Sequence, residues 1–309
     1  MQLTPQLKVA LTGANGQLGY QLVKKLADKV TLLALDRAAL DIANNAQVEQ
    51  TLLAFAPDVI INAAAYTAVD KAEQEQELAK AINETGPQNL AKVAAKLDAV
   101  LIHVSTDYVF DGQSDKPYVE TDATNPQSSY GQTKLNGEQA IVKYCAKHLI
   151  LRTAWVFAEH GNNFVKTMLR LAQSRPELGV VADQIGGPTY AGDIADAIIS
   201  IVSQLNAENE QRFGIYHYSG APYVSWHHFA CDIIQQAVTQ KLIDKAPQVN
   251  AITTSQYPTP AKRPAFSMLN CCKIQQAFGI VPSNWQAALN ALILYKWFKW
   301  KLSKQLFQM

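Results

Sequence analysis

The sequence has few of the features that mark secreted, membrane or nucleic-acid-binding proteins. Cysteine is scarce: there are four in 309 residues, and none forms a C-x-x-C pair. We therefore expect reduced thiols rather than disulfides or a structural zinc site. The formal net charge is +1, which gives the chain no global attraction to nucleic acid or to an acidic membrane. The four cysteines are Cys145, Cys231, Cys271 and Cys272.

Long apolar runs are also missing. No stretch approaches the roughly 18 apolar residues of a membrane-spanning helix. The N-terminal apolar run is broken at Gly13, so we expect neither a signal peptide nor an integral membrane segment. Hydrophobic residues make up 48% and charged residues 17% of the chain, which is typical of a globular enzyme. We expect a cytoplasmic protein with room for two lobes.

The first half alternates short apolar runs with longer amphipathic segments. Continuous apolar runs are typical of strands that are buried on both faces of a parallel sheet. The alternation predicts an α/β fold, a Rossmann-type doubly wound parallel sheet with right-handed crossovers. The predicted strands are Lys8–Thr12, Val30–Leu35, Val59–Asn62, Val100–Ser105 and His148–Thr153, and the predicted helices are Gln17–Ala27, Asn45–Ala56, Leu78–Lys96 and Tyr130–Ala146.

The second half is less regular and predicts a smaller C-terminal α/β substrate-binding lobe. Its predicted elements are helices at Asp193–Leu205 and Ser225–Thr239, a strand at Gly214–Tyr218 and an extended loop at Tyr257–Pro264, which holds three of the 13 prolines. We expect an NAD(P)-binding domain over residues 1–157 and a mainly substrate-binding lobe over residues 158–309, with some elements that return to the first domain.

A glycine-rich turn follows the first predicted strand. Its G-x-x-G-x-x-G spacing, Gly13–Gly19, is a variant of the dinucleotide fingerprint, in which backbone N–H groups approach a pyrophosphate at a helix N-terminus. Asp36 ends the second strand and could bond the ribose hydroxyls of NAD. Arg37 comes next and could instead meet the 2′-phosphate of NADP. The sequence leaves the choice between NADH and NADPH open.

A second motif supplies candidate catalytic residues. Tyr130 and Lys134 are four residues apart on a predicted helix, so their side chains can reach one cleft. A lysine ammonium, together with an oxidised nicotinamide, would lower the tyrosine pKa from its reference value of about 10. Tyr130 could then give a proton to a carbonyl oxygen. Thr106, just past the fourth strand, could hydrogen-bond the reacting oxygen or the phenol.

Together these motifs resemble the extended branch of the short-chain dehydrogenase/reductase family, and within it the dTDP-4-dehydrorhamnose reductases. The resemblance covers nearly the whole chain. Its segments are GANGQLG at Gly13–Gly19, PDVIINAAAYTAVDKAE at Pro57–Glu73, STDYVFDG at Ser105–Gly112, YGQTKLNGE at Tyr130–Glu138, LRTAWVF at Leu151–Phe157, GNNFVKTMLRLA at Gly161–Ala172 and YPTPAKRP at Tyr257–Pro264.

The resemblance implies an NAD(P)H-dependent oxidoreductase of dTDP-rhamnose biosynthesis, a branch of carbohydrate and lipopolysaccharide biosynthesis. Its substrate would be a dTDP-linked hexose 4-ketone. Thr106, Tyr130 and Lys134 match the catalytic positions. The cofactor positions would be Gly13, Gly16, Gln17, Leu18, Gly19, Asp36, Arg37, Asp41, Ile42, Ala65, Tyr66 and Thr67, with Tyr130 and Lys134. The substrate positions would be Val69, Thr106, Asp107, Trp155 and Arg263, with Asp70 and Lys71 in the same loop as Val69.

Two implied roles are chemically specific. The Trp155 indole would pack against the apolar face of the deoxysugar, and the alternative is a core tryptophan at the end of a strand. The Arg263 guanidinium would pair with the diphosphate, whose oxygens suit its fork of donors.

The sequence departs from the family at a metal site. Some bacterial members form dimers joined through magnesium that glutamates hold, and the matching positions here are Gln21, Gly192 and Gln286. None is acidic, whereas magnesium prefers carboxylate oxygens. We therefore expect no metal there, and a monomer or a homodimer that metal does not bridge.

Two other functions stay open. The regulatory β subunit of methionine adenosyltransferase resembles the same reductases and binds a dinucleotide as a non-catalytic partner. A sugar-nucleotide epimerase or dehydratase would share the fold and cofactor, and the pair Thr106-Asp107 could belong to such a site. The basic aromatic tail, Leu294–Met309, is expected to pack as a terminal helix, with binding to a membrane surface as the alternative.

Overall fold

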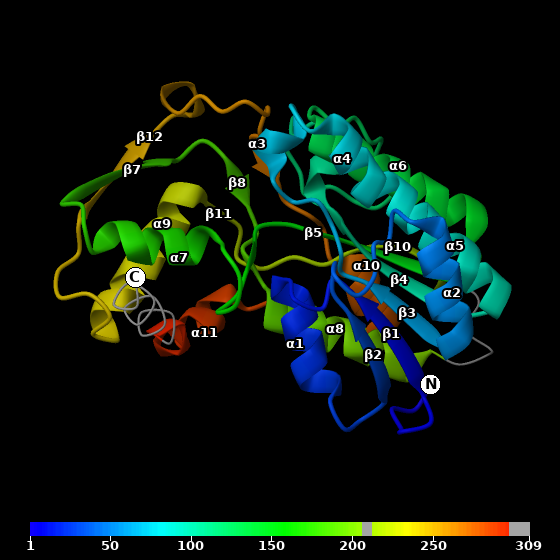
Figure 1. The fold of residues 1–309 in the computed structure, drawn as a ribbon. Helices are drawn as coiled ribbons and strands as arrows, with labels where there is room; N and C mark the ends of the chain where they lie inside the picture. The colour runs from blue at the N-terminus through cyan, green and yellow to red at the C-terminus, as the bar shows by residue number, and fades with distance from the viewer. Residues whose placement is uncertain (206–211, 297–309) are drawn as a thin grey trace, which may run out of the picture.

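The computed structural model describes residues 1–205 and 212–296 of the chain, and its main feature is a six-stranded parallel sheet (Figure 1). The strand order is β10-β5-β4-β3-β1-β2, and every neighbouring pair is parallel. The strands are β1 (Lys8–Thr12), β2 (Thr31–Leu35), β3 (Val59–Asn62), β4 (Val100–Thr106), β5 (His148–Thr153) and β10 (Gly214–His217). The predicted doubly wound α/β fold is confirmed.

The direction of winding reverses between β1 and β3. From β1 the chain passes to β2 on one side, and it then returns to place β3, β4, β5 and β10 on the other. Such a reversal opens a crevice at the carboxyl ends of the two central strands, where open α/β sheets bind their ligands. The segments that follow β1 and β3 therefore flank the expected cofactor site.

Helices cover both faces of the sheet. On one face α1 (Gln17–Leu26) and α8 (Ala191–Gln204) pack on Val9 and Leu11 of β1. On the other, α2 (Asn45–Phe55) and α5 (Gly86–Leu97) pack on Ala10, and α6 (Ser129–Tyr144) lies alongside. Figure 1 shows α1 and α8 below the sheet and the other three beyond its opposite face. Alternate strand residues thus enter separate cores, which is why the strands read as continuous apolar runs.

Residues beyond β5 build a second lobe, apart from α8, β10 and α10 (Cys272–Phe278), which pack on the sheet domain. The lobe core contains Phe157, Phe229 and Trp285. Its elements are β6 (Val156–Phe157), α7 (Phe164–Ala172), β7 (Glu177–Val181), β8 (Ile185–Gly186), β9 (Thr189–Tyr190), β11 (Val224–Ser225), α9 (Trp226–Thr239), β12 (Gln248–Ile252), β13 (Phe266–Ser267) and α11 (Trp285–Leu289). The remaining short elements are α3 (Val69–Ala72), α4 (Gln76–Lys80), the π-helical segment Ala81–Thr85, and 3-10 turns at Asp107–Val109, Thr254–Gln256 and Leu292–Lys296.

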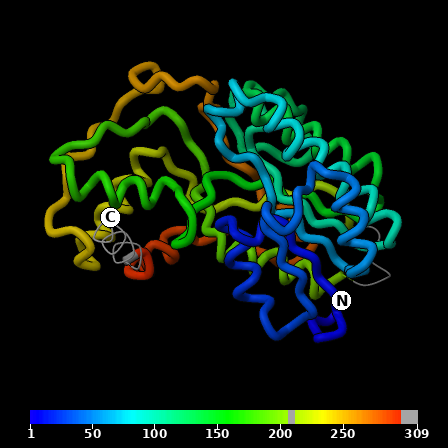
Figure 2. The backbone as a smooth tube through the Cα atoms, viewed as in Figure 1, coloured from blue at the N-terminus to red at the C-terminus, as the bar shows by residue number. Residues whose placement is uncertain are grey.

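The chain returns from this lobe to the sheet domain through an extended loop. In Figure 2 the orange segment leaves the second lobe and runs toward the cyan segment that holds α3. Within this loop the Ala261 N–H donates to Asp70 Oδ1 over 3.3 Å. Residues 257–264 contain neither helix nor strand, as their prolines predict.

One predicted helix is wrong in detail. Leu78–Lys96 is not a single α-helix, because α4 passes through the π-helical segment Ala81–Thr85 into α5. Pro87 lies in the first turn of α5 and has no N–H to donate to the Asn83 carbonyl. Gly137 of α6 packs so closely there that a Cβ would lie 2.1 Å from the Asn83 oxygen. The interruption therefore accommodates the contact between α6 and this segment.

None of the helices within residues 1–205 and 212–296 is both long and apolar enough to cross a membrane. Most of the basic aromatic tail, residues 297–309, lies outside the described residues.

Candidate active site

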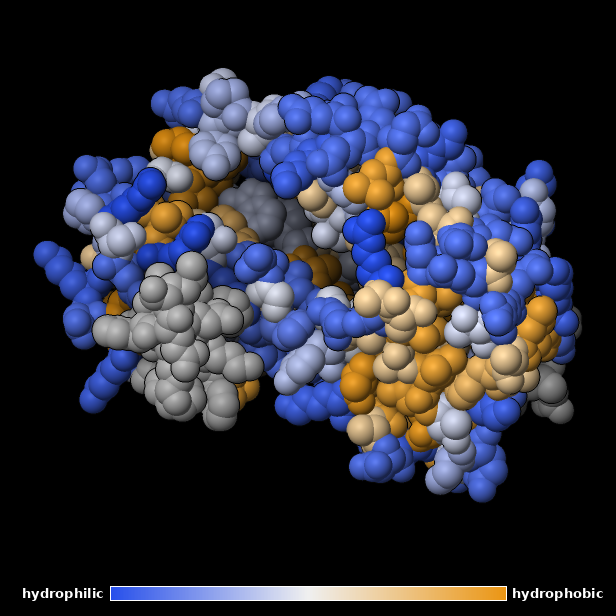
Figure 3. Space-filling view, in the orientation of Figure 1, coloured by the Kyte–Doolittle hydropathy of each residue, from blue (hydrophilic) through white to orange (hydrophobic). Residues whose placement is uncertain are grey.

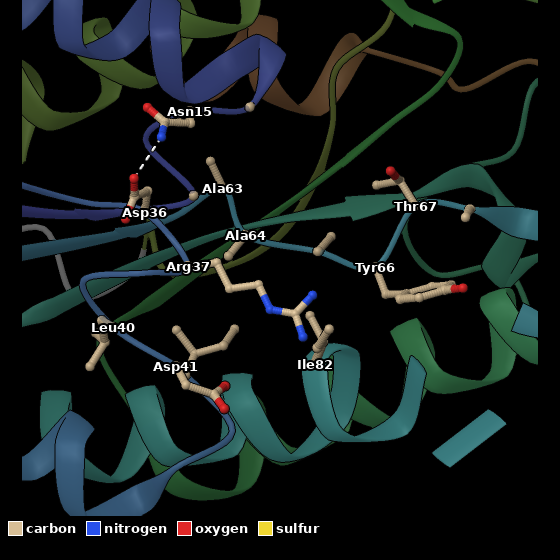
Figure 4. Close-up of a pocket in the computed structure, with 15 residues that line it drawn as sticks. Asn15, Asp36, Arg37, Leu40, Asp41, Ala63, Ala64, Tyr66, Thr67 and Ile82 are labelled. Carbon is tan, nitrogen blue, oxygen red and sulfur yellow. Dashed lines mark hydrogen bonds between the residues drawn. The ribbon is translucent and has the colours of Figure 1, made fainter. Parts of the chain in front are cut away.

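A pocket of about 360 Å³ lies at the crevice between β1 and β3 (Figure 4). The glycine turn and the end of β2 form one side of it, and the segment that follows β3 forms another. Nine of the predicted cofactor residues line it: Gly13, Gly16, Asp36, Arg37, Asp41, Ile42, Ala65, Tyr66 and Thr67. The position matches the site that the fold predicts for a dinucleotide.

Two glycines of the turn are required by close backbone contacts. Gly13 has φ +76°, and a Cβ there would lie 2.5 Å from the Ala64 nitrogen. A Cβ on Gly19 would lie 2.0 Å from the Gly13 carbonyl oxygen. The turn therefore packs against both its own helix and the loop after β3. Its backbone and the N-terminus of the ten-residue helix α1 form a cradle suited to a pyrophosphate.

The carboxylate of Asp36 is held within the protein. Oδ1 accepts hydrogen bonds from the Ala38 and Ala39 N–H groups, and Oδ2 accepts one from Asn15 Nδ2 over 2.6 Å. The side chain of Arg37 instead extends across the pocket, with its guanidinium near Ile82 (Figure 4). The position of Arg37 suits the 2′-phosphate of an NADP-type cofactor.

The remaining predicted cofactor residues lie outside the walls of this pocket. Gln17 Oε1 accepts a hydrogen bond from Asn163 Nδ2, and Leu18 is buried in the core under α1. Sequence reasoning also missed six lining residues, Asn15, Leu40, Ala63, Ala64, Ala68 and Ile82. Asn15, Ala63 and Ala64 lie inside the quoted motifs, so their neighbours gave the signal. Leu40 and Ile82 are apolar, and nothing in their local sequence distinguishes them from core residues.

The predicted catalytic residues Thr106 and Tyr130 meet at the carboxyl end of β4. The Thr106 hydroxyl acts to lower the pKa of the Tyr130 phenol, and Thr106 Oγ1 donates to Asp107 Oδ1 over 3.0 Å. Ser128 caps α6 by accepting from the Gly131 N–H, which fixes the first turn that carries Tyr130. The Tyr108 ring meets the Tyr130 ring edge to face, with centroids 5.4 Å apart. The phenol thus has a fixed position beside a hydroxyl partner.

Burial raises the pKa of two acidic groups here. The pKa of Tyr130 is raised mainly by burial, and the Thr106 hydrogen bond opposes the shift. The pKa of Asp107 rises to about 6 for the same main reason. The sequence predicts that Lys134 lowers the pKa of Tyr130, whereas in the structure this pKa is raised. Thr106, Asp107 and Tyr108 are the polar groups that act on this phenol. At neutral pH Tyr130 is therefore a phenol that holds a proton to donate.

Lys134 lies one turn beyond Tyr130 and is buried. Its Nζ donates to the Val104 carbonyl oxygen over 2.7 Å and lies 3.1 Å from His103 Nε2. Burial lowers its pKa to about 8. His103 is a further residue that sequence reasoning missed, although a histidine within the apolar run VLIHVST of β4 is an available signal.

A larger cavity of about 530 Å³ opens in the second lobe, next to the sheet domain. Figure 3 shows the molecule hollowed between its two halves. The Phe164, Met168 and Trp226 side chains give the cavity an apolar wall, and Arg175 and Arg263 give it positive charge. Arg263 Nη2 lies 2.7 Å from Asp70 Oδ2, and Nη1 donates to the Tyr108 hydroxyl oxygen over 3.2 Å. Arg263 therefore links this cavity to the residues around Tyr130.

The other predicted substrate residues lie at the boundary of the two halves. Val69 packs with Tyr66 and Tyr108 around Tyr130. Trp155 has the left-handed φ of +49°, and its indole stacks on that of Trp226 with centroids 3.5 Å apart. Trp155 follows β5, whose last residue, Thr153, pairs with Thr106 of β4.

The three positions that match the family's metal site carry no carboxylate. Gln21 is buried, and its Nε2 donates to Glu159 Oε1 over 2.5 Å. Gly192 lies in the first turn of α8, and Gln286 is exposed on α11. The expectation of a monomer, or of a homodimer that metal does not bridge, stays a prediction.

Comparison with known proteins places these features in one family. The model of the RmlD substrate binding domain matches residues 7–296. The dTDP-4-dehydrorhamnose reductase of Aggregatibacter actinomycetemcomitans is 52% identical over 290 residues, which cover 93% of this chain and 99% of the relative. That of Escherichia coli is 43% identical and covers 93% and 97% of the two chains.

Solved structures agree. The dTDP-4-dehydrorhamnose reductase from Clostridium acetobutylicum superposes with a TM-score of 0.86 at 38% identity and covers 98% of this chain and 100% of its own. The Bacillus anthracis enzyme, solved in complex with NADP, has a TM-score of 0.86 at 36% identity and covers 94% of this chain and 99% of its own.

Proposed function

This chain belongs to the RmlD substrate binding domain family, and from that premise we propose that it is an NAD(P)H-dependent oxidoreductase that reduces dTDP-4-dehydro-L-rhamnose to dTDP-L-rhamnose. The observation that carries the proposal is the position of Tyr130. Its ring meets the Tyr108 ring, the Tyr108 hydroxyl accepts a hydrogen bond from Arg263 of the larger cavity, and Tyr66 of the crevice pocket packs against the apolar cluster that contains Tyr130. A proton donor therefore stands where a nicotinamide and a sugar would meet.

The crevice pocket fits a dinucleotide with an NADP-type preference. The contacts of Gly13 and Gly19 leave room only for backbone beside the pyrophosphate position. The Asp36 carboxylate is engaged by three donors from the protein, and the Arg37 side chain crosses the pocket. The same preference is consistent with the NADP bound to the Bacillus anthracis relative. NADH remains the second candidate cofactor.

The chemistry divides between the cofactor and the protein. When bound, the reduced nicotinamide supplies the hydride for the carbonyl carbon. Tyr130 donates its phenol proton to the carbonyl oxygen, so the ketone becomes a secondary alcohol. The Thr106 hydroxyl supports the same oxygen or the resulting phenolate. Lys134, held by the Val104 carbonyl, would reach the nicotinamide ribose.

The larger cavity would hold the nucleotide end of the substrate. Its apolar wall suits a thymine ring, and Arg263 would pair with the diphosphate by sharing or exchanging its contact with Asp70. Trp155 and Val69 would then contact the deoxysugar near Tyr130, with the backbone and side chain of Asp107 beside it.

Cofactor binding and substrate binding are assigned to successive parts of the sequence. We propose residues 1–157 as the cofactor-binding domain and residues 158–309 as mainly the substrate lobe, from which α8, β10 and α10 return to the sheet domain. A role in sugar-nucleotide synthesis would place the protein in the cytoplasm, as a monomer or as a homodimer without bridging metal.

Consumption of NADPH with dTDP-4-dehydro-L-rhamnose tests this function. We expect one dTDP-L-rhamnose for each NADPH oxidised, identified by NMR of the purified product. A chain that binds NADPH but leaves it unoxidised would instead act as a dinucleotide-binding regulatory subunit. With no net NADPH loss, a product of inverted stereochemistry would indicate an epimerase, and a product that has lost water would indicate a dehydratase.

A further inference from the structure

A row of buried polar side chains crosses the sheet and ends at Lys134. The register pairs Thr12 of β1 with Asn62 of β3, and Asn62 with His103 of β4, so three neighbouring strands place these residues side by side. Thr12 Oγ1 donates to Asn62 Oδ1 over 2.8 Å, Asn62 Nδ2 lies 2.9 Å from His103 Nδ1, and His103 Nε2 lies 3.1 Å from Lys134 Nζ. All four residues are at most 1% exposed, so the proposed catalytic mechanism leaves three buried polar groups unexplained.

The direction of these hydrogen bonds is fixed by one backbone group. Asn62 Oδ1 also accepts from the Ala64 N–H over 3.1 Å, and a backbone N–H can only donate. The amide oxygen of Asn62 therefore faces Thr12 and Ala64, and its NH₂ group faces His103. Because that NH₂ only donates, His103 Nδ1 must accept, and the single proton of the neutral ring sits on Nε2.

This tautomer determines which protonation state of Lys134 can form a hydrogen bond with His103. An Nε2–H group donates toward Nζ, and an ammonium has no lone pair with which to accept. The contact at 3.1 Å is thus a hydrogen bond only when Lys134 is a neutral amine, which still donates to the Val104 carbonyl. Burial also favours the neutral forms of both side chains, because it lowers the pKa of His103 and of Lys134.

The other charged groups near this pair are already engaged. Glu138, one turn further along α6, favours the ammonium form of Lys134, but its carboxylate is paired with Arg152 of β5, with Nη2 and Oε2 2.7 Å apart. Asp107 and Tyr108 act on Tyr130 rather than on Lys134. His103 is therefore the side chain that contacts Nζ from the sheet, beside the Val104 carbonyl.

We propose that His103 is a positioning residue for the reaction: oriented by Asn62, it donates its Nε2 proton to Nζ and thereby stabilises the neutral amine form of Lys134 relative to the ammonium. Protonation of Lys134 then requires that this bond breaks, so His103 lowers the pH at which the lysine gains its charge. The consequence for turnover rests on the proposed function, whereas the state of the ring does not.

Histidine ¹⁵N NMR of the full-length protein at neutral pH reads the ring state directly. The signal of His103 is assigned by its loss in His103→Asn. We expect a protonated Nε2 and an unprotonated Nδ1. A proton on Nδ1, or on both nitrogens, would overturn the proposal whether or not the protein turns over substrate.

Two variants test the cause. In Asn62→Asp the carboxylate can only accept, so the ring should carry its proton on Nδ1 and offer Nε2 as an acceptor to an ammonium. Thr12→Val is the matched control, because the Ala64 N–H still fixes the amide and the Nε2 tautomer should persist. An unchanged tautomer in Asn62→Asp would contradict the assigned role of Asn62.

The pH dependence of turnover distinguishes this positioning role from a purely structural one, which would leave it unchanged. In His103→Gln the amide oxygen can accept from Nζ, which favours the ammonium. We expect the Lys134-dependent limb of the kcat/KM profile for NADPH-dependent reduction to move upward by about one pH unit in this variant, and likewise in Asn62→Asp. If both folded variants show the same pH limb of kcat/KM as wild type, the proposal is overturned. If the wild-type protein shows no turnover, that result counts against the proposed function instead.

Discussion

The indole rings of Trp155 and Trp226 lie face to face, with centroids 3.5 Å apart and planes 9° from parallel. Trp155 lies between β5, which ends at Thr153, and β6, and Trp226 begins α9 of the second lobe. The stack therefore fixes the orientation of the second lobe at the point where the chain leaves the sheet domain. It also fixes the Trp155 ring, which carries the predicted contact with the sugar.

Gly186→Ala should disturb this arrangement without touching the cofactor pocket. A Cβ at Gly186 would lie 2.6 Å from Trp155 Cε2, so the indole must shift. We expect KM for the sugar nucleotide to rise by about tenfold, equivalent to roughly 1.4 kcal/mol of binding, with KM for NADPH unchanged. Steady-state kinetics with each substrate varied in turn measure both. Equal losses for the two substrates would show that the glycine matters for folding rather than for the sugar site.

Arg37→Ala tests the cofactor preference. Because the guanidinium crosses the pocket, its loss should raise KM for NADPH by about tenfold or more while KM for NADH changes little. The ratio of the two kcat/KM values, measured on one preparation, removes differences in the active fraction. A ratio that stays at the wild-type value would place the 2′-phosphate elsewhere.

Tyr130→Phe tests the proton donor. The change keeps the ring that packs against Tyr108 and removes only the phenol hydroxyl. We expect kcat to fall by about a hundredfold or more, with the Kd for NADPH from fluorescence titration unchanged. A variant that retains the wild-type rate would assign the proton to another group.

Asp107→Asn should change how stability depends on pH. The folded pKa of Asp107 is about 6, above its ordinary value of 3.8, so ionisation of the buried carboxyl opposes folding. Relative to the variant, wild type should lose stability as the pH rises from about 4 through about 6, by up to about 3 kcal/mol. Urea unfolding on both sides of that window gives the two differences in free energy. A difference that is the same at both ends would mean that Asp107 ionises normally in the folded protein.

Much of the sheet domain could be predicted because its signals are local. The strand Lys8–Thr12 and the glycine turn after it were readable from apolar runs and spacing, and the crevice followed from the topology. The break before α5 was missed although Pro87 is a local signal for it; the close contact of Gly137 with the Asn83 carbonyl, by contrast, is long-range. The motifs identified Tyr130, Lys134 and Thr106, but not His103, which contacts Lys134.

The parts of the site that were missed are long-range contacts. His103 meets Lys134 through the register of β4 beside α6, and Trp226 meets Trp155 across 71 positions of sequence. The link from Arg263 to Asp70 spans 193 positions. No periodicity in the sequence encodes such pairs, and the pKa of Tyr130 depends on the burial that they create.

Transfer of deuterium from labelled NADPH tests the central claim most directly. NADPH that carries deuterium on the transferred position of its nicotinamide is incubated with dTDP-4-dehydro-L-rhamnose, and the sugar is examined by NMR and mass spectrometry. We predict dTDP-L-rhamnose with one deuterium on C4 for each NADPH consumed, and none when the label is on the opposite face of the ring. A product without deuterium on C4 would contradict the account, as would labelled NADPH that binds and is recovered unchanged.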